Sequence, residues 1–212
     1  MSIKGFIFDL DGVICFTDEY HYLAWKEMAD GMGIYFDREI NNRLRGVSRM
    51  ASLDIILERY DGPTLSQEEK EALAAQKNDI YRNLLGRMTP ADLPTEVKET
   101  LDALRAKGMK LSIGSSSKNA PFILERIGLG GYFDAVSDGN NITRSKPDPE
   151  VFLKAADMLG LEPAMCLVVE DAHAGVAAAV AGAFDCAAMG DAAHNPQAAY
   201  HLSSFSDLLD IQ

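Results

Sequence analysis

Two carboxylates, Asp9 and Asp11, stand two residues apart in the segment Phe8-Asp9-Leu10-Asp11-Gly12. They directly follow a short apolar run that has the composition of a buried strand. The glycine beside the second acid permits a tight turn, so that both carboxylates can face one ligand. Taken alone, the pattern fits a ligand site at a strand end, a solvated turn or a calcium loop, although the sequence lacks the glycine and glutamate positions of an EF-hand loop.

Polar groups that could bind an anion or a metal recur at three later points. The segment Ser115-Ser116-Ser117-Lys118-Asn119 offers donors at the start of a predicted helix, which suits an anion. Lys146 precedes a second helix, at an end where the helix dipole disfavours a cation. Glu170 and Asp171 end an apolar strand. Each group also has an ordinary interpretation, as a serine-rich cap, a solvated lysine in a turn and a pair of N-capping acids.

These groups lie at the ends of predicted elements of an α/β fold. Apolar runs predict strands at 4–9, 109–114, 165–169 and 186–190. Helical patterns predict helices at 95–107, 120–127, 149–159 and 172–181, and the first three are expected to end in left-handed caps at Gly108, Gly128 and Gly160. The alternation predicts a doubly wound (Rossmann-like) parallel sheet, in which ligands bind at the carboxyl ends of the strands.

The stretch 17–86 breaks the alternation, because it shows only helical periodicity. Ser66-Gln67-Glu68-Glu69 is a capping-box pattern that starts the last of its helices. We therefore expect an all-α cap domain over residues 17–86, inserted into an α/β catalytic core made of residues 1–16 and 87–212. On length alone, a single compact module is also possible.

Composition and charge limit the classes of function. The 212 residues are 47% hydrophobic, enough to bury one sizeable core, and carry a formal net charge of -12. Such a charge argues against nucleic acid, whose binding needs a basic surface. The three cysteines show no metal-binding spacing, and the sequence shows neither a signal-peptide pattern nor an apolar run long enough to span a bilayer. We expect a cytoplasmic protein that binds neither nucleic acid nor membranes.

Taken in this order, the four polar groups resemble the haloacid dehalogenase superfamily of phosphotransferases over nearly the whole chain. The resemblance implies that Asp9 attacks phosphorus to form an aspartyl phosphate. It implies that Asp11 acts as general acid and base and gives its backbone carbonyl to Mg²⁺. Ser115 and Lys146 would hold the transferring phosphoryl group. The remaining ligands of the metal, beside Asp9, would be the acidic pair Glu170 and Asp171.

Elementary electrostatics explains why such a site needs a metal. Placing Asp9, Glu170 and Asp171 within about 4 Å of one another creates like-charge pairs that each cost up to about 4 kcal/mol at an effective dielectric near 20. Mg²⁺ cancels this repulsion, accepts oxygen ligands and neutralises charge on the phosphoryl oxygens. The carboxylate of Asp11 must stay off the metal, because it has to carry a proton to the leaving oxygen.

Three segments of the predicted cap resemble the β-phosphoglucomutase subgroup of that superfamily. They are Asp18-Glu19-Tyr20-His21-Tyr22-Leu23-Ala24-Trp25, Arg45-Gly46-Val47-Ser48-Arg49, which matches the substrate-specificity loop, and Gln76-Lys77-Asn78. By that likeness, Thr17 and His21 would position Asp11 and the hinge, and Lys77 would reach toward the sugar. Trp25 is interpreted as a packing residue.

The same likeness makes Arg49 the residue that binds the phosphate that is not being transferred, helped by Ser117 and Asn119. Ser116 and Lys118 belong to the same substrate-binding loop. A sugar bisphosphate needs a cationic clamp at each end, and the planar fork of an arginine suits bidentate binding better than a lysine does.

The resemblance implies a monomeric, Mg²⁺-dependent isomerase that interconverts β-D-glucose 1-phosphate and glucose 6-phosphate, with an aspartyl phosphate and a sugar 1,6-bisphosphate that is also the activator. A sugar-phosphate phosphatase of the same superfamily is the alternative, and a non-enzymatic phospho-acceptor module is a more distant one. The chain departs from the subgroup at Cys15-Phe16, where small polar or acidic residues usually precede the threonine. This departure bears on the hinge rather than on the reaction, and Cys15 is interpreted as a packing residue.

Overall fold

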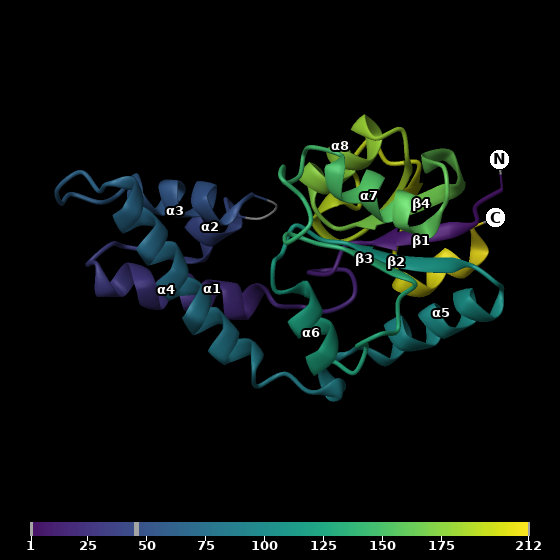
Figure 1. The fold of residues 1–212 in the computed structure, drawn as a ribbon, viewed down its shortest axis with the longest axis horizontal. Helices are drawn as coiled ribbons and strands as arrows, with labels where there is room; N and C mark the ends of the chain where they lie inside the picture. The colour runs from purple at the N-terminus through teal and green to yellow at the C-terminus, as the bar shows by residue number, and fades with distance from the viewer. Residues whose placement is uncertain (1, 45–46, 212) are drawn as a thin grey trace. The chain divides into compact units, whose positions relative to one another are not determined.

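The computed structural model describes residues 2–44 and 47–211, which form two compact units (Figure 1). One unit joins residues 1–16 to residues 88–212, and the other comprises residues 17–87. Arg45 and Gly46, part of the segment that resembles a substrate-specificity loop, lie outside the described residues. Arg87 belongs to the second unit, one residue past the boundary expected from the sequence, because its N–H still donates to the carbonyl of Leu84 at 3.0 Å.

Within the described residues, the first unit is built on a sheet of six parallel strands. The strands are β1 (Gly5–Phe8), β2 (Lys110–Gly114), β3 (Ala135–Ser137), β4 (Cys166–Glu170), β5 (Asp185–Ala188) and β6 (Tyr200–His201). Their order in the sheet is β3-β2-β1-β4-β5-β6, which confirms the predicted doubly wound fold. The winding reverses between β1 and β4, and ligands of such sheets bind at the carboxyl ends of the strands at this point.

Helices cover both faces of the sheet. α5 (Thr95–Ala106) lies over one face, and α7 (Glu150–Leu159) and α8 (His173–Ala181) lie over the other (Figure 1). α6 (Ala120–Arg126) follows β2, and short 3₁₀ turns form at Pro90–Asp92, Pro163–Met165, Gly190–Ala192 and Phe205–Asp210. The glycines predicted to cap α5, α6 and α7 have φ angles of +80°, +80° and +66°. Ile7 and Val168 of the sheet pack with Phe152 of α7 and Val176 of α8 in one buried cluster.

Among the described residues, the second unit contains helices and no strands. Its helices are α1 (Asp18–Gly31), α2 (Arg38–Asn42), α3 (Arg49–Leu57) and α4 (Gln67–Leu85). α1 packs against α4, and the unit has a core of its own around Trp25, Met28, Phe36 and Leu53. The capping box forms as predicted, since Ser66 Oγ accepts from the N–H of Glu69 at 3.2 Å and the Glu69 carboxylate accepts from the N–H of Ser66 at 2.7 Å. None of the helices in residues 2–44 and 47–211 combines the length and the apolar composition that crossing a bilayer requires.

Candidate active site

Strand pairing makes Asp9 and Glu170 neighbours, although they come from distant parts of the chain. β1 and β4 pair in parallel, with Phe8 opposite Val169. The N–H of Asp9 continues this ladder by donating to the carbonyl of Val169 at 3.0 Å. The two acids therefore lie side by side at the carboxyl edge of the sheet, where its winding reverses.

Lys146 lies between these two acids. Its ammonium group donates one hydrogen bond to Asp9 Oδ1 and another to Glu170 Oε1. Asp9, Lys146 and Glu170 are only 8%, 7% and 1% exposed. Because water is largely excluded, the opposite charges interact strongly, and each depends on the others for its compensation.

Burial and neighbouring charges shift the pKa values of Glu170 and Lys146. Burial raises the pKa of Glu170 to about 7; the Asp9 carboxylate adds to this effect and the Lys146 ammonium opposes it. Burial would lower the pKa of Lys146, but the carboxylates of Asp9 and Glu170 raise it above its ordinary value. Lys146 therefore keeps its positive charge beside Asp9 throughout the neutral pH range.

Two glycines leave room for the acidic side chains. Gly12 has a φ of +88° and lies against the Asp171 carboxylate, which a Cβ at this position would overlap. Gly175 of α8 lies against the Glu170 carboxylate in the same way. Glu170 Oε2 also accepts from the N–H groups of Asp171 and Ala172, both at 3.1 Å. Backbone therefore lies close to both carboxylates, and two N–H groups orient that of Glu170.

The donor set at this edge fits a divalent metal ion. Asp9, Glu170 and Asp171 each offer one carboxylate oxygen, and these oxygens all lie within 4.8 Å of one another. The three carboxylates outnumber the ammonium group of Lys146 that contacts two of them, so the group has an excess of negative charge. Mg²⁺ takes oxygen ligands and carries the charge needed to balance this excess, whereas zinc favours nitrogen and sulfur.

Asp11 lies in the tight loop that follows β1. The N–H of Cys15 closes this loop by donating to the carbonyl of Leu10 at 3.1 Å. Asp11 is partly exposed, whereas Cys15 is fully buried. Burial, and then the charges of Asp11 and Asp9, raise the pKa of the Cys15 thiol well above its ordinary value. A buried neutral thiol is unreactive, in line with its interpretation as a packing residue, while Phe16 is 62% exposed.

The serine-rich segment forms the loop between β2 and α6. Ser115 Oγ accepts from the N–H of Ser117, and Ser117 Oγ accepts from the N–H of Asn119, both at 3.2 Å. A serine hydroxyl that accepts a bond still has a proton to donate to an anion. Ser116 Oγ accepts from the N–H of Lys146 at 3.4 Å, which joins this loop to the lysine loop. Ser115 and Asn119 are buried, whereas Lys118 is exposed.

In the helical unit, His21 and Lys77 form a polar pair. Lys77 Nζ lies 2.9 Å from His21 Nδ1. Because a lysine ammonium can only donate, Nδ1 is the acceptor and the ring proton is on Nε2. Burial, and then the charges of Lys77 and Arg49, lower the pKa of His21 well below 6.5. The ring is therefore neutral and presents one N–H donor.

Two aromatic residues surround this pair. Lys77 is 3% exposed, and its Nζ lies 4.7 Å from the centroid of the Trp25 ring and 4.5 Å from that of Tyr81. The Tyr81 ring stacks on His21 with centroids 4.1 Å apart. Trp25 packs in the core as expected, but its contact with Lys77 and the part of Tyr81 were not anticipated. The i, i+4 spacing of His21 with Trp25, and of Lys77 with Tyr81, is the signal that could have found them.

Arg49 and Thr17 also have defined partners in the helical unit. Arg49 is the first residue of α3, and its guanidinium donates to Asn78 Oδ1 at 2.8 Å. The helix dipole disfavours a cation at this end, so the position does not serve helix stability. Burial lowers the pKa of Arg49 from its ordinary value. Thr17 is fully buried, and its Oγ1 accepts from the Tyr81 hydroxyl at 3.1 Å.

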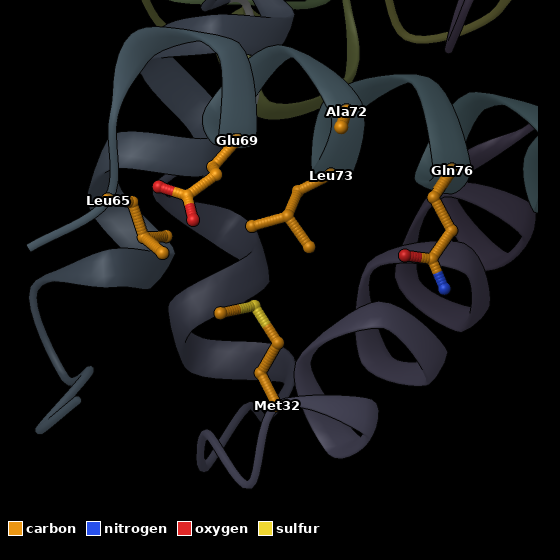
Figure 2. A pocket seen from close by; sticks show the side chains of 6 residues that line it. All are labelled: Met32, Leu65, Glu69, Ala72, Leu73 and Gln76. Atoms are coloured by element: carbon orange, nitrogen blue, oxygen red, sulfur yellow. The ribbon is translucent and has the colours of Figure 1, made fainter. Parts of the chain in front are cut away.

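A hollow of about 290 Å³ lies elsewhere in the helical unit. Figure 2 shows its lining, with the side chains of Met32 and Leu73 pointing toward each other. None of the site residues predicted from the sequence lines this hollow, and Glu69 at its edge is held in the capping box. We therefore assign it no part in the chemistry.

Comparison with known proteins agrees with the fold. The model of the haloacid dehalogenase-like hydrolase family matches residues 3–182. β-Phosphoglucomutase of Bacillus subtilis (strain 168) is 44% identical over 177 residues, which are 83% of this chain and 78% of that protein. Fructose-1-phosphate phosphatase YqaB of Escherichia coli (strain K12) is 34% identical over 184 residues, which are 85% of this chain and 93% of that protein.

A solved structure gives the same result. The crystal structure of β-phosphoglucomutase from Clostridium difficile matches with a TM-score of 0.89 and 36% identity, covering 97% of this chain and 93% of that chain. The similarity therefore extends over both units and not over the α/β unit alone. This protein belongs to the haloacid dehalogenase-like hydrolase family, in its β-phosphoglucomutase-like subgroup.

Proposed function

We propose that this protein is an Mg²⁺-dependent phosphotransferase that interconverts β-glucose 1-phosphate and glucose 6-phosphate. The observation that carries the proposal is the buried contact of Asp9 with Lys146 in a group of acids that fits a divalent ion. An ammonium group at this place can neutralise charge on the phosphoryl oxygens while Asp9 attacks phosphorus. The similarity to a β-phosphoglucomutase over 83% of the chain supports sugar phosphates as substrates.

In the proposed cycle, Asp9 begins as an aspartyl phosphate. The 6-hydroxyl of glucose 1-phosphate attacks this phosphorus, the bond to the Asp9 oxygen breaks, and Asp11 takes the hydroxyl proton. The sugar is now the 1,6-bisphosphate and Asp9 is a carboxylate. After the bisphosphate turns around, Asp9 attacks the phosphorus on O1, and Asp11 returns its proton to that oxygen. Glucose 6-phosphate leaves, and the aspartyl phosphate is restored.

The groups around Asp9 have separate parts in this proposal. Lys146 and the Ser115 hydroxyl hold the oxygens of the transferring phosphoryl group, and Asp11 moves the proton. Asp9, Glu170 and Asp171, with the Asp11 carbonyl, would hold Mg²⁺, which would supply charge neutralisation at those oxygens.

The helical unit is proposed to bind the rest of the substrate. Arg49 takes the phosphate that is not transferred, with Ser117 and Asn119 of the serine loop. The charge and fork geometry of a guanidinium suit such a group. His21 is neutral and protonated on Nε2, so it can donate one hydrogen bond, and Lys77 can bind a sugar hydroxyl.

A sugar-phosphate phosphatase is the second candidate. It is favoured by the 34% identity to a fructose-1-phosphate phosphatase over 85% of the chain. In that reaction, water rather than a sugar hydroxyl takes the phosphoryl group from Asp9. The groups of the α/β unit suit both reactions, because Asp11 can accept a proton from water or from a hydroxyl.

A phosphorus NMR time course with β-glucose 1-phosphate, Mg²⁺ and a trace of the 1,6-bisphosphate tests the proposal. A mutase converts the substrate resonance into that of glucose 6-phosphate while the total of sugar phosphate stays constant. Release of inorganic phosphate without isomerisation would make the protein a phosphatase. The lack of both products, in protein that is folded and holds Mg²⁺, would overturn both assignments.

A further inference from the structure

The loop that carries Lys146 is long and irregular. Residues 138–149 connect β3 to α7 without forming a helix or a strand. Connections in compact domains have a median of about 4–6 residues, and ordering a longer one costs conformational entropy. Lys146 is nevertheless buried and in contact with both Asp9 and Glu170. Contacts outside the lysine must therefore hold the loop in this conformation.

The carboxylate of Glu150, the first residue of α7, binds the loop just before Lys146. The N–H of Thr143 donates to both carboxylate oxygens at 3.1 Å, the Thr143 hydroxyl donates at 2.9 Å, and the N–H of Arg144 donates at 2.8 Å. The Glu150 side chain is 13% exposed. Burial would raise the pKa of Glu150, but these donors and Lys154 lower it to about 2. Glu150 is therefore ionised at neutral pH.

Glu150 is not occupied with capping its own helix. The N–H of Glu150 donates to Asp148 Oδ1 at 3.0 Å, so Asp148 satisfies one of the N–H groups that have no partner within the helix at the start of α7. The Glu150 carboxylate instead reaches back to Thr143 and Arg144, seven and six positions earlier in the chain. Losing the carboxylate would therefore free the loop while the bond from the Glu150 N–H to Asp148 remains.

Two cations beside Glu150 fasten further parts of the same loop. Lys154 Nζ lies 3.2 Å from Glu150 Oε1 and also donates to the carbonyl of Asn141. Arg144 NH1 lies 3.0 Å from Asp148 Oδ2. The chain before Lys146 is thus tied to the first turns of α7, and Arg144 links it to Asp148 on the other side of Lys146.

We propose that Glu150 is a positioning residue for phosphoryl transfer. By tying Thr143 and Arg144 to α7, it holds the Lys146 ammonium beside Asp9. The inference rests on the proposed function, since it requires Asp9 to carry a phosphoryl group. Glu150 acts through the loop and touches neither substrate nor metal, so its role would show in the rate of transfer more than in substrate affinity.

The experiment uses Glu150→Gln, which keeps the size of the side chain but removes its charge and one acceptor oxygen. Asp157→Asn, at an exposed position of the same helix, is the matched control. Thermal unfolding establishes that both variants are folded. Acetyl phosphate is the phosphoryl donor, because it can phosphorylate Asp9 without a sugar. We expect kcat to fall by about 10- to 100-fold in Glu150→Gln, with KM within about three-fold, because a misplaced group costs rate rather than binding.

A spectroscopic readout reports the lysine position directly. Beryllium trifluoride with Mg²⁺ mimics a phosphoryl group on the carboxylate of Asp9, and its ¹⁹F resonances respond to nearby donors such as the Lys146 ammonium. These resonances should shift in Glu150→Gln and stay in place in Asp157→Asn. A folded Glu150→Gln protein with wild-type kcat and wild-type resonances would overturn the positioning role while the proposed function stands.

Two other results would have a different meaning from wild-type behaviour of Glu150→Gln. A wild-type protein that forms no fluoroberyllate complex would overturn the Asp9 phosphoryl site, and the inference with it. If Glu150→Gln does not fold, Thr143→Val takes its place, because it removes only the hydroxyl donor of this contact. A shift of the same resonances in Thr143→Val supports the inference, and an unchanged spectrum overturns it.

Discussion

The N–H of Asp9 donates a hydrogen bond to the carbonyl of Val169 at 3.0 Å, one residue past the last paired residue of β1. This bond fixes the proposed nucleophile relative to the strand that carries Glu170. Both acids then contact the same lysine, Lys146. The proposed nucleophile is thus held by sheet backbone, and such rigid support keeps catalytic groups near their productive positions.

Replacement of Asp9 by asparagine should abolish phosphoryl transfer while the fold is kept. Asparagine has nearly the same shape but lacks the anionic oxygen that attacks phosphorus, so we expect turnover to fall by at least about 10⁴-fold. Mass spectrometry after incubation with acetyl phosphate should show a phosphoryl adduct on the wild type and none on Asp9→Asn. Turnover near that of the wild type would refute the nucleophile.

Gly175→Ala should weaken metal binding without unfolding the protein. The new Cβ would overlap the Glu170 carboxylate, which must then turn away from Asp9 and Asp171. Disturbing the support of a metal ligand typically costs about 10- to 100-fold in metal affinity. A titration of activity against Mg²⁺ measures this shift, with Val180→Ala at an exposed position of the same helix as control. Equal Mg²⁺ dependence in both variants would contradict the role of Glu170.

Lys146→Met should destabilise the metal-free protein. Removing one partner of a buried charge group leaves the others uncompensated and typically costs about 3–5 kcal/mol in the free energy of unfolding. Urea unfolding in the presence of a chelator measures this loss. Lys26→Met removes the exposed ion pair with Asp30 and should leave the free energy unchanged, because exposed pairs are screened by water. Similar losses of unfolding free energy in the two variants would show that the buried contacts of Lys146 stabilise the protein no more than an exposed ion pair does.

The sequence alone was enough to predict the strands that consist of apolar runs and the acidic residues that follow them. β1 and β4 and the acids that follow them are of this kind. β3, β6 and α2 could not be predicted, because three, two and five residues are too few to establish a period. Their existence depends on tertiary contacts, such as the pairing of β3 with β2.

The candidate site shows the same division. Asp9, Lys146 and Glu170 could be placed at one edge of a sheet, since acids and a lysine at strand ends are conspicuous. Their mutual contacts depend on strand register and loop conformation, which no local pattern encodes. The sequence did not reveal the contact of Trp25 with Lys77 or that of Glu150 with the lysine loop. Each of these residues acts through another residue, so its own type and position give no signal of the site.

Arg49→Lys should impair binding of the phosphate that is not transferred and leave transfer of the other phosphoryl group nearly unchanged. A lysine keeps the charge but loses bidentate geometry, so isomerisation of glucose 1-phosphate should lose about 10- to 100-fold in kcat/KM, the range for losing a hydrogen bond to a charged group. Hydrolysis of acetyl phosphate, which has no second phosphate, should change little. Arg43→Lys, an exposed residue paired with Glu58, is the control. Equal losses with both donors would contradict the clamp.

The helical unit should lose stability on acidification because of His21. Its pKa is lowered in the folded protein, so below pH 6.5 the unfolded chain binds a proton that the folded chain does not, and stability falls as pH falls. The loss reaches about 1.4 kcal/mol for each pH unit below the unfolded pKa. Trp25, the protein's one tryptophan, reports unfolding of this unit by fluorescence. His21→Asn should show a weaker pH dependence than the wild type or His194→Asn.

The parallel pairing of β1 with β4 has a consequence for how the protein is made. Asp9 is translated well before β4, the strand that places it and that leads to Glu170 and Asp171. Until then the nascent chain lacks the partner acids Glu170 and Asp171 beside Asp9. We therefore expect chains that end before β4 to lack the proposed phosphoryl transfer, because the site can form only when β4 pairs with β1.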